Sequence, residues 1–311
     1  MTTSKGTIVG YGEYVYQHVP GWAKIPESWE WGHCVGVAID SKDRVYVYNR
    51  SAHPMMVFDT DGNLLNTWGE DKIGSAHHVF AGPDDTLYTT DIGDHTVRKW
   101  TADGEILMQL GTPNKPPEAM SGKPFNRPTD VTVAPDGTLY ITDGYGNARV
   151  HRYTADGKHL LSWGEPGTGP GQFNTPHGVR VGPDGQVYVV DRENFRVQVF
   201  TEDGQFIRQF MGLNRPDQVV FNPDGILMIP ELGFRTDFVA DAPPPNPVAP
   251  PAGIKFMTPM GQWVGGWGMS TQDPGDLLAA HAVALDSKGA MYIGETLIGH
   301  RVQKYVRVKQ A

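Results

Sequence analysis

Residues 131–140 read VTVAPDGTLY, and this stretch decides the fold because it recurs along the chain. Apolar residues alternate on both sides of a Pro-Asp-Gly turn, which is the signature of a β-hairpin. Close copies read VFAGPDDTLY at 79–88, VRVGPDGQVY at 179–188 and VALDSKGAMY at 283–292, and weaker copies occupy 37–46 and 219–228. The chain therefore contains six copies of one hairpin.

A second hairpin follows the first in most copies. Its turns are Asp-Gly at 61–62, 103–104, 156–157 and 203–204, and Met-Gly at 260–261. Four strands per copy, repeated about every 40 to 60 residues, are typical of the blades of a β-propeller. We therefore predict an all-β protein with one six-bladed, NHL-like β-propeller domain over residues 1–311. The predicted blades are 31–70, 77–111, 125–164, 174–212, 215–268 and 281–308.

The last predicted blade has room for only three strands before the chain ends at Ala311. The segment 7–19, TIVGYGEYVYQHV, reads as a strand near the other end of the chain. Pairing the two ends removes an open sheet edge. We therefore expect this N-terminal strand to complete the last blade and close the ring.

Composition limits the partners and the compartment. The net charge is −9 and there is no basic run, which disfavours nucleic acid and anionic membranes. Cys34 is the single cysteine, so no intrachain disulfide can form and a reducing compartment is expected. Neither a signal peptide nor a membrane-length apolar run is visible, so we predict a cytoplasmic location. The expected partner is a small-molecule or peptide-derived substrate, and the oligomeric state stays open.

Three histidines occupy the same position in alternate copies of the repeat. His77, His177 and His281 each lie seven residues before the turn residue of the first hairpin. In a closed ring, equivalent positions of alternate blades converge on the axis. Three imidazoles with an open fourth position suit catalytic zinc, although copper, iron or cobalt would also accept them. The other three copies carry Val35, Thr129 and Asp217 at this position.

Strand alternation places further polar residues on the same face as these histidines. Arg50 and Tyr145 follow second strands and are not part of the repeat consensus, so they are candidate catalytic residues. A tyrosine beside a dication and an arginine can act as a base. Arg192 and Asp217 are candidate substrate-binding residues. Asp91 is a third candidate substrate-binding residue. Aspartate also occupies this repeat position as Asp143 and Asp191, which favours a hydrogen bond that braces a turn.

Several segments resemble the peptidyl-α-hydroxyglycine α-amidating lyase family of NHL-repeat propellers. These segments are YNR at 48–50, TDGYGNAR at 142–149, GQFNTPH at 171–177 and DREN at 191–194. The likeness extends from about residue 32 to residue 305. It implies a catalytic zinc on His77, His177 and His281, and an active-site pair formed by Tyr145 and Arg50. It also implies cleavage of an N-acyl-α-hydroxyglycine into an amide and glyoxylate.

The chain also departs from that family. Ala279 replaces an active-site methionine of the family, and the disulfides of the family are absent from this chain. Ala282 replaces the acidic ligand of the family's structural calcium. The carbonyls of Val37 and Val79 could still contribute ligands, but the missing carboxylate argues against Ca²⁺.

We therefore expect a zinc-dependent carbon–nitrogen lyase acting on an α-hydroxy-amide. Arg50 would either bind a substrate carboxylate or keep Tyr145 ionised. The alternatives are a zinc-dependent hydrolase or hydratase with another small substrate, and a non-enzymatic propeller that binds another protein. The proline-rich segment 242–252 is either a lid over the metal or a stiff connector.

Overall fold

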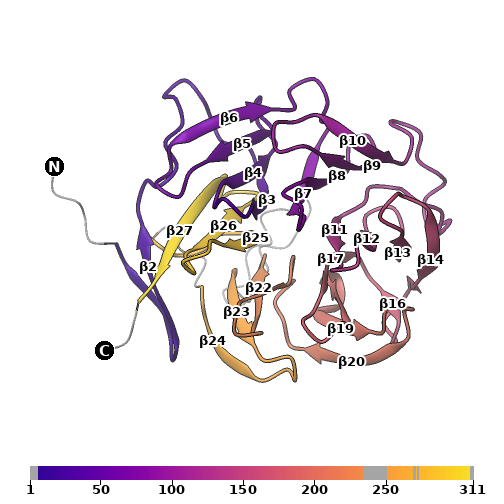
Figure 1. Cartoon of the computed structure of the whole chain (residues 1–311). Coiled ribbons are helices and arrows are strands. Elements are labelled where there is room, and N and C mark those ends of the chain that lie inside the picture. Colours follow the sequence, from indigo (N-terminus) through magenta and orange to yellow (C-terminus); the bar gives the residue numbers. More distant parts are fainter. Residues whose placement is uncertain (1–5, 234–250, 269–270, 272, 309–311) are drawn as a thin grey trace, which may run out of the picture.

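The computed structural model describes residues 6–233, 251–268, 271 and 273–308. These residues form six antiparallel sheets arranged around a central axis, as Figure 1 shows. The predicted six-bladed β-propeller is confirmed. The regular elements of the described residues are strands and one short 3₁₀-helix, η1 (Arg192–Asn194). Among them, no helix has the length and apolar character that crossing a membrane requires.

The first three blades are regular, with four strands each, ordered from the axis outward. They comprise β3 (Cys34–Ile39), β4 (Val45–Asn49), β5 (Met55–Phe58) and β6 (Leu64–Trp68); β7 (Ala76–Ala81), β8 (Leu87–Asp91), β9 (Thr96–Trp100) and β10 (Ile106–Leu110); and β11 (Asp130–Val133), β12 (Leu139–Asp143), β13 (Arg149–Tyr153) and β14 (His159–Trp163).

The other three blades follow the same order, and blade 5 has a very short innermost strand. They comprise β17 (Pro176–Val181), β18 (Val187–Asp191), β19 (Arg196–Phe200) and β20 (Phe206–Met211); β21 (Val220–Phe221), β22 (Leu227–Glu231), β23 (Gly253–Met257) and β24 (Trp263–Trp267); and β25 (Ala280–Leu285), β26 (Met291–Glu295) and β27 (Arg301–Arg307). A small parallel pair, β15 (Glu165–Pro166) and β16 (Gln172–Phe173), joins blades 3 and 4.

The N-terminal segment completes blade 6, as predicted, but it is not one strand. It forms a hairpin of β1 (Ile8–Tyr11) and β2 (Tyr14–Val19), and β2 pairs with β27. The prediction of a single strand over 7–19 was wrong because Gly12 adopts a positive φ of 64° and turns the chain. Blade 6 therefore has five strands, and β1 is its outer edge.

The hydrophobic core is divided among the seams between neighbouring blades. Each cluster of buried apolar side chains draws on two adjacent sheets. The outer-strand tryptophans lie in three of these seams. Trp68 packs on Trp100, Trp163 on Phe200 and Trp267 on Tyr305, with ring centroids 5.1, 5.9 and 5.2 Å apart. Packing of this kind fixes the rotation of one blade against the next.

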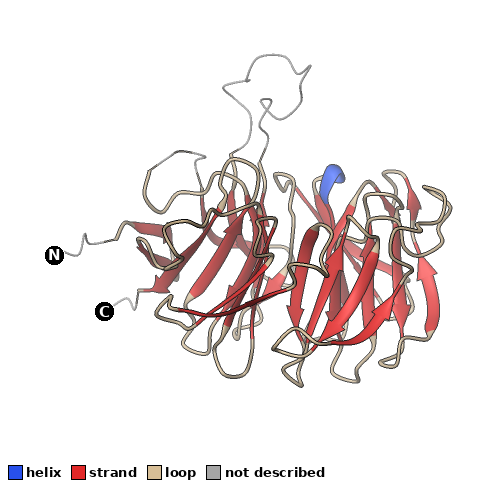
Figure 2. Ribbon diagram, turned by 90° about the horizontal axis from the view of Figure 1, so that it is seen from above, coloured by secondary structure: helices blue, strands red, loops and turns tan. Residues whose placement is uncertain are grey.

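Buried acids hold the loops that precede the innermost strands. The last residue of the second strand accepts a hydrogen bond from the backbone N–H of such a loop in five of the six blades. The pairs are Asp91 with Ser75 (2.8 Å), Asp143 with Asn126 (3.0 Å), Asp191 with Asn174 (2.7 Å), Glu231 with Asn214 (2.6 Å) and Glu295 with Leu278 (2.6 Å). These loops lie at the end of the ring where Figure 2 shows η1, and they fix where each innermost strand begins.

Candidate metal centre

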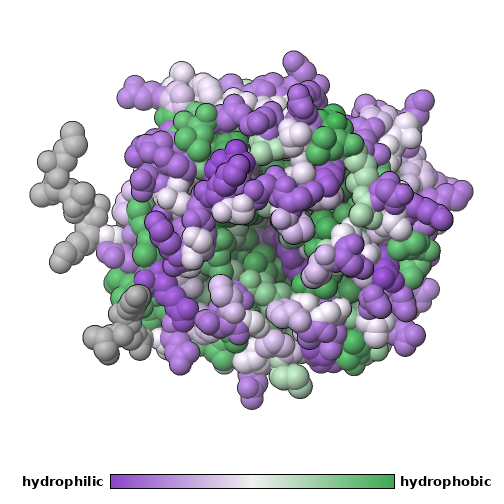
Figure 3. Space-filling view, viewed as in Figure 1, coloured by the Kyte–Doolittle hydropathy of each residue, from purple (hydrophilic) through white to green (hydrophobic). Residues whose placement is uncertain are grey.

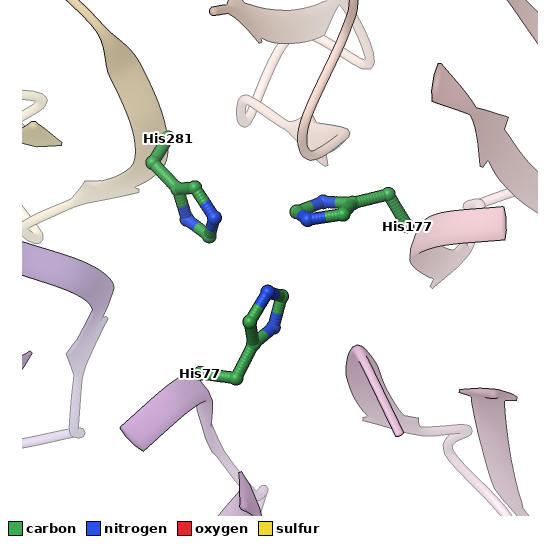
Figure 4. A group of neighbouring side chains, drawn as sticks. All are labelled: His77, His177 and His281. Atoms are coloured by element: carbon green, nitrogen blue, oxygen red, sulfur yellow. The ribbon is translucent and has the colours of Figure 1, made fainter. Parts of the chain in front are cut away.

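Three imidazoles from alternate blades meet at the axis of the ring. His77 lies on β7, His177 on β17 and His281 on β25, and Figure 4 shows the three rings pointing toward one another. One nitrogen of each lies within 4.8 Å of the others. All three side chains are buried. The sequence positions that we predicted to converge do converge.

A backbone carbonyl fixes the orientation of each ring. Each Nδ1 lies at hydrogen-bond distance from a carbonyl oxygen, which can only accept, so Nδ1 carries the proton. The carbonyls belong to the residues at the equivalent repeat position of the next blade. The pairs are His77 with Thr129 (2.6 Å), His177 with Asp217 (2.7 Å) and His281 with Val35 (2.7 Å). A neutral ring held in this way keeps the lone pair of Nε2 for a metal.

The electrostatics of the site also keep the rings neutral. Burial lowers the pKa of all three histidines well below 6.5. The positive charges of Arg50 and Arg192 lower these pKa values further. Neutral imidazole is the form that binds a metal ion. Three inward Nε2 atoms with fixed tautomers therefore fit a transition metal that has one coordination position left for substrate.

Tyr145 joins the three histidines at the axis. Its hydroxyl oxygen lies 3.1 Å from Nε2 of His77 and 3.0 Å from Nε2 of His177. Tyr145 comes directly after Gly144, whose missing side chain leaves room for the carbonyl of Pro176. The loop after β12 can therefore approach blade 4 and bring the phenol to the centre of the ring.

Arg192 is the arginine that contacts Tyr145. Its Nη1 lies 3.1 Å from the hydroxyl of Tyr145 and 3.4 Å from Oδ1 of Asp217, and its Nε donates to Glu193 at 2.8 Å. Burial opposes the charge of Arg192, but Tyr145, Asp217 and Glu193 outweigh it and raise its pKa. Burial raises the pKa of Asp217 to about 7, although Arg192 and Arg215 oppose this shift.

Arg50 follows β4 of blade 1, the blade between those that carry His281 and His77. Its Nε donates to the carbonyl oxygen of Ala76 at 2.8 Å, directly before His77 in the chain. Burial lowers the pKa of this guanidinium, and the charge of Arg127 lowers it further. Among the described residues, Arg50 forms no ion pair with a carboxylate. Arg50 therefore lies next to the strand that carries His77, and Arg192 is the arginine that contacts the hydroxyl group of Tyr145 directly.

Comparisons with known proteins identify the family. A family model described as NHL repeat matches residues 125–153 and 173–200. NHL repeat-containing protein 3 of Homo sapiens is 32% identical over 310 residues, which cover 94% of this chain and 84% of the human protein.

The chain belongs to the NHL repeat family.

Other relatives and solved structures resemble this NHL repeat protein over different lengths. Peptidyl-glycine alpha-amidating monooxygenase of Mus musculus is 29% identical over 227 residues, covering 60% of this chain and 23% of the mouse protein. Peptidyl-alpha-hydroxyglycine alpha-amidating lyase 1 of Drosophila melanogaster is 33% identical over 107 residues, covering 33% of this chain and 19% of the fly protein. A gluconolactonase of Xanthomonas campestris has a TM-score of 0.63 at 15% identity, with coverage of 98% and 99%. This last likeness concerns the fold alone.

One residue of this NHL repeat protein was missed in the sequence. The guanidinium carbon of Arg127 lies 5.1 Å from the centre of the Tyr145 ring. Arg127 stands two residues before the repeat position of Thr129 and is followed by Pro128. Thr175 stands in the same place before Pro176 and His177. The register that revealed the histidines could therefore also have revealed Arg127.

The axial channel beneath the histidines does not suit calcium. Val37 and Val79 line a cavity of about 190 Å³ there, visible as the hollow at the centre of Figure 3. Arg180 lines the same cavity, and its Nη1 lies 3.1 Å from Oδ2 of Asp130. A guanidinium already supplies a positive charge in this part of the channel. The residues present therefore do not fit a Ca²⁺ ion, and Val37 and Val79 are not its ligands.

Asp91 and the proline-rich segment 242–252 were two further candidates from the sequence. Asp91 is 1% exposed, and it accepts hydrogen bonds from the backbone N–H groups of Gly74, Ser75 and Gly93. These contacts agree with the turn-bracing role that the recurrence of this residue favoured, and a role of Asp91 in substrate binding stays a prediction. In the proline-rich segment 242–252, residues up to 250 lie outside the described part of the chain, so the choice between lid and connector stays a prediction.

Proposed function

We propose that this protein is a metal-dependent carbon–nitrogen lyase. Its substrate would be an α-hydroxy-amide similar to an N-acyl-α-hydroxyglycine, and its products would be an amide and an aldehyde such as glyoxylate. The observation that carries the proposal is the position of the Tyr145 hydroxyl, at hydrogen-bond distance from Nε2 of both His77 and His177. A potential base lies beside the metal position, and the similarity to amidating lyases supports this reading.

The metal proposed is zinc, held by Nε2 of His77, His177 and His281. A bound zinc ion supplies a Lewis acid, which makes the α-hydroxyl group of the substrate easier to deprotonate. Zinc is the usual choice for three imidazoles, and the same ligands also accept other divalent transition metals.

Tyr145 would carry the proton in both directions. Its phenolate oxygen takes the proton of the substrate α-hydroxyl group, and the carbon–oxygen bond becomes a carbonyl. The carbon–nitrogen bond breaks, and its electron pair goes to the amide nitrogen. Tyr145 then returns the proton to that nitrogen, so no proton is gained or lost overall. Arg192, whose Nη1 lies 3.1 Å from the phenol oxygen, would stabilise the phenolate that exists before the first transfer and again after the second.

Arg50 and Arg127 would hold the anionic end of the substrate. Both lie beside the site, and in the described part of the chain neither is ion-paired with a carboxylate, whereas Arg192 is paired with Glu193 at 2.8 Å. Burial lowers the pKa of Arg50, and the repulsion between the Arg50 and Arg127 guanidinium groups adds to this shift. A substrate carboxylate would relieve this repulsion. The protein as a whole carries a charge of −9, so the positive charge is a local property of the site.

Metal analysis and a substrate assay test the proposal together. Purified wild-type protein should contain about one equivalent of zinc and release glyoxylate from α-hydroxyhippurate. His177→Ala should lose both properties. His159→Ala is the matched control, because His159 is exposed and lies on the outer strand β14.

The remaining outcomes separate the alternatives. Stoichiometric metal without glyoxylate release would favour a hydrolase or hydratase, and a panel of lactones and amides would then identify the reaction. Wild-type protein that binds no transition metal would favour a non-enzymatic propeller.

A further inference from the structure

A buried polar cluster lies one residue below the metal centre along the axial strands. It consists of His78, Asp130, Arg180 and Gln218, which come from blades 2, 3, 4 and 5. Their exposed fractions are 3%, 1%, 8% and 1%. None of them belongs to the proposed reaction. Burying four polar side chains together is costly unless they satisfy one another or nearby backbone groups.

Asp130 connects the strands that carry His77 and His177. Its Oδ2 accepts from the backbone N–H of Val179 at 2.9 Å and from Nη1 of Arg180 at 3.1 Å. Its Oδ1 lies 2.9 Å from Nε2 of His78. Val179 comes two residues after His177, and His78 directly follows His77. One carboxylate therefore holds β7 and β17 at a fixed separation.

Gln218 extends the connection to the strand that carries His281. Its Oε1 accepts from the backbone N–H of Val283 at 2.7 Å, two residues after His281. Its Nε2 lies 3.1 Å from Nε2 of His78. Nε2 of His78 can make one hydrogen bond, here to Asp130, so its approach to Gln218 is a packing contact. Gln218 directly follows Asp217, whose carbonyl accepts from Nδ1 of His177, so Gln218 links β25 with the residue that orients His177.

The need for such links follows from propeller geometry. The innermost strand of each blade is an edge strand, so one row of its backbone N–H groups has no strand partner. Val179 and Val283 present N–H groups of this kind to the channel, and Asp130 and Gln218 satisfy them. Besides hydrogen bonds such as those from the histidine rings to neighbouring carbonyls, the blades meet at the axis through apolar packing, which sets distances less sharply than hydrogen bonds do.

We propose that Asp130 and Gln218 are positioning residues for the metal centre. They set the spacing of β7, β17 and β25, and through it the distances among the three Nε2 atoms. Burial raises the pKa of the Asp130 carboxyl group, but Arg180 and the hydrogen-bond donors around Asp130 together outweigh it and lower that pKa. The proposal rests on the metal centre of the proposed function but not on the reaction it performs.

The test compares metal binding in Asp130→Asn, Gln218→Met and Asp94→Asn. Asparagine preserves the shape of Asp130 but not its charge, and methionine removes the acceptor for Val283 without introducing a charge. Asp94 is the matched control, because it is also buried and paired with an arginine, Arg98, but lies away from the channel. Zinc affinity is measured by chelator competition, and coordination geometry from the visible spectrum after Co²⁺ substitution.

Both channel variants should bind zinc about ten-fold or more weakly, the range typical of residues that orient metal ligands. Their Co²⁺ spectra should differ from that of the wild type. Asp94→Asn should lower the thermal midpoint of the metal-free protein without changing either metal property. If Asp130→Asn does not fold, Gln218→Met decides alone.

Two results would overturn the proposal. The first is a folded Gln218→Met protein with wild-type zinc affinity and an unchanged Co²⁺ spectrum. The second is an equal loss of zinc affinity in Asp94→Asn. That result would mean that the channel variants lose zinc affinity because the whole protein is less stable. A wild-type protein that binds no metal would remove this proposal together with the proposed function, whereas metal binding without glyoxylate release would leave this proposal standing.

Discussion

Nη1 of Arg192 lies 3.1 Å from the hydroxyl oxygen of Tyr145. The same guanidinium is ion-paired with Asp217 and Glu193, and these two contacts hold it in place. A positive charge at this distance stabilises a phenolate more than a phenol. In the proposed reaction Tyr145 accepts a proton next to the three imidazoles, and Arg192 is the residue in direct contact with the phenol oxygen.

Removing the hydroxyl group of Tyr145 should abolish turnover without removing the metal. Tyr145→Phe loses the group that transfers the proton, and general acid–base groups of this kind contribute about 10²- to 10⁴-fold to rate. We expect kcat for glyoxylate release to fall by at least about 100-fold, with zinc content unchanged. Tyr140→Phe, a buried tyrosine of the same blade, serves as the control. An active Tyr145→Phe enzyme would exclude the phenol as the base.

Removing the charge of Arg192 should change the pH dependence of the reaction. In Arg192→Met, nothing replaces the positive charge 3.1 Å from the phenol oxygen. We expect kcat to fall by about ten-fold or more, and the pH at which kcat reaches half its maximum to move upward.

Arg50→Met should instead raise KM. If the pH profile shifted in Arg50→Met and not in Arg192→Met, Arg50 would be the arginine that stabilises the phenolate of Tyr145.

Arg127 should discriminate between charged and uncharged substrates. Arg127→Gln keeps a polar side chain over the Tyr145 ring but loses the charge. We expect KM for α-hydroxyhippurate to rise about ten-fold, which corresponds to about 1.4 kcal/mol, while an uncharged ester of the same compound is unaffected. Arg152→Gln is the control, since Arg152 lies on β13 of blade 3 and pairs with Glu202 and Asp203 in the turn between β19 and β20 of blade 4. Equal effects on both substrates would argue against carboxylate recognition.

The metal-free protein should become less stable as the pH falls below about 6.5. The pKa values of His77, His177 and His281 are lower in the folded protein than in the unfolded chain, because burial disfavours the charged rings. Below pH 6.5 the unfolded chain therefore binds protons that the folded chain does not, and the free energy of unfolding decreases. Asp217, with a pKa raised to about 7, acts in the opposite direction, as do Asp91, Asp191 and Glu231, whose pKa values burial also raises. Burial also lowers the pKa values of His18, His33 and His78, which adds to the effect of the three rings at the axis.

Thermal midpoints of the metal-free protein at pH 8, 7, 6 and 5 measure this effect. The midpoint should decrease toward pH 5, and His177→Ala should show a shallower decrease because it has one such histidine fewer. Zinc should raise the midpoint most at high pH, where it does not compete with protons. A midpoint that stays constant or rises toward pH 5 would contradict the neutral, buried state of the three rings.

The sequence by itself determined the repeat, the fold and the convergence of the histidines. Turn residues and alternating strands are local signals, so VTVAPDGTLY and its copies predict hairpins wherever they occur. A shared repeat position then predicts a shared place in each blade. His77, His177 and His281 could be assigned to one site for this reason, without any knowledge of packing.

Only the tertiary structure decided how the blades contact one another. The carbonyls of Val35, Thr129 and Asp217 fix the histidine rings from neighbouring blades, and Arg192 contacts Tyr145 from blade 4. These contacts depend on the rotation of each blade and on side-chain packing in the seams, which have no periodic signal in the sequence. The N-terminal hairpin was missed for a related reason, because the turn at Gly12 was not distinguished from a strand that continues to Val19.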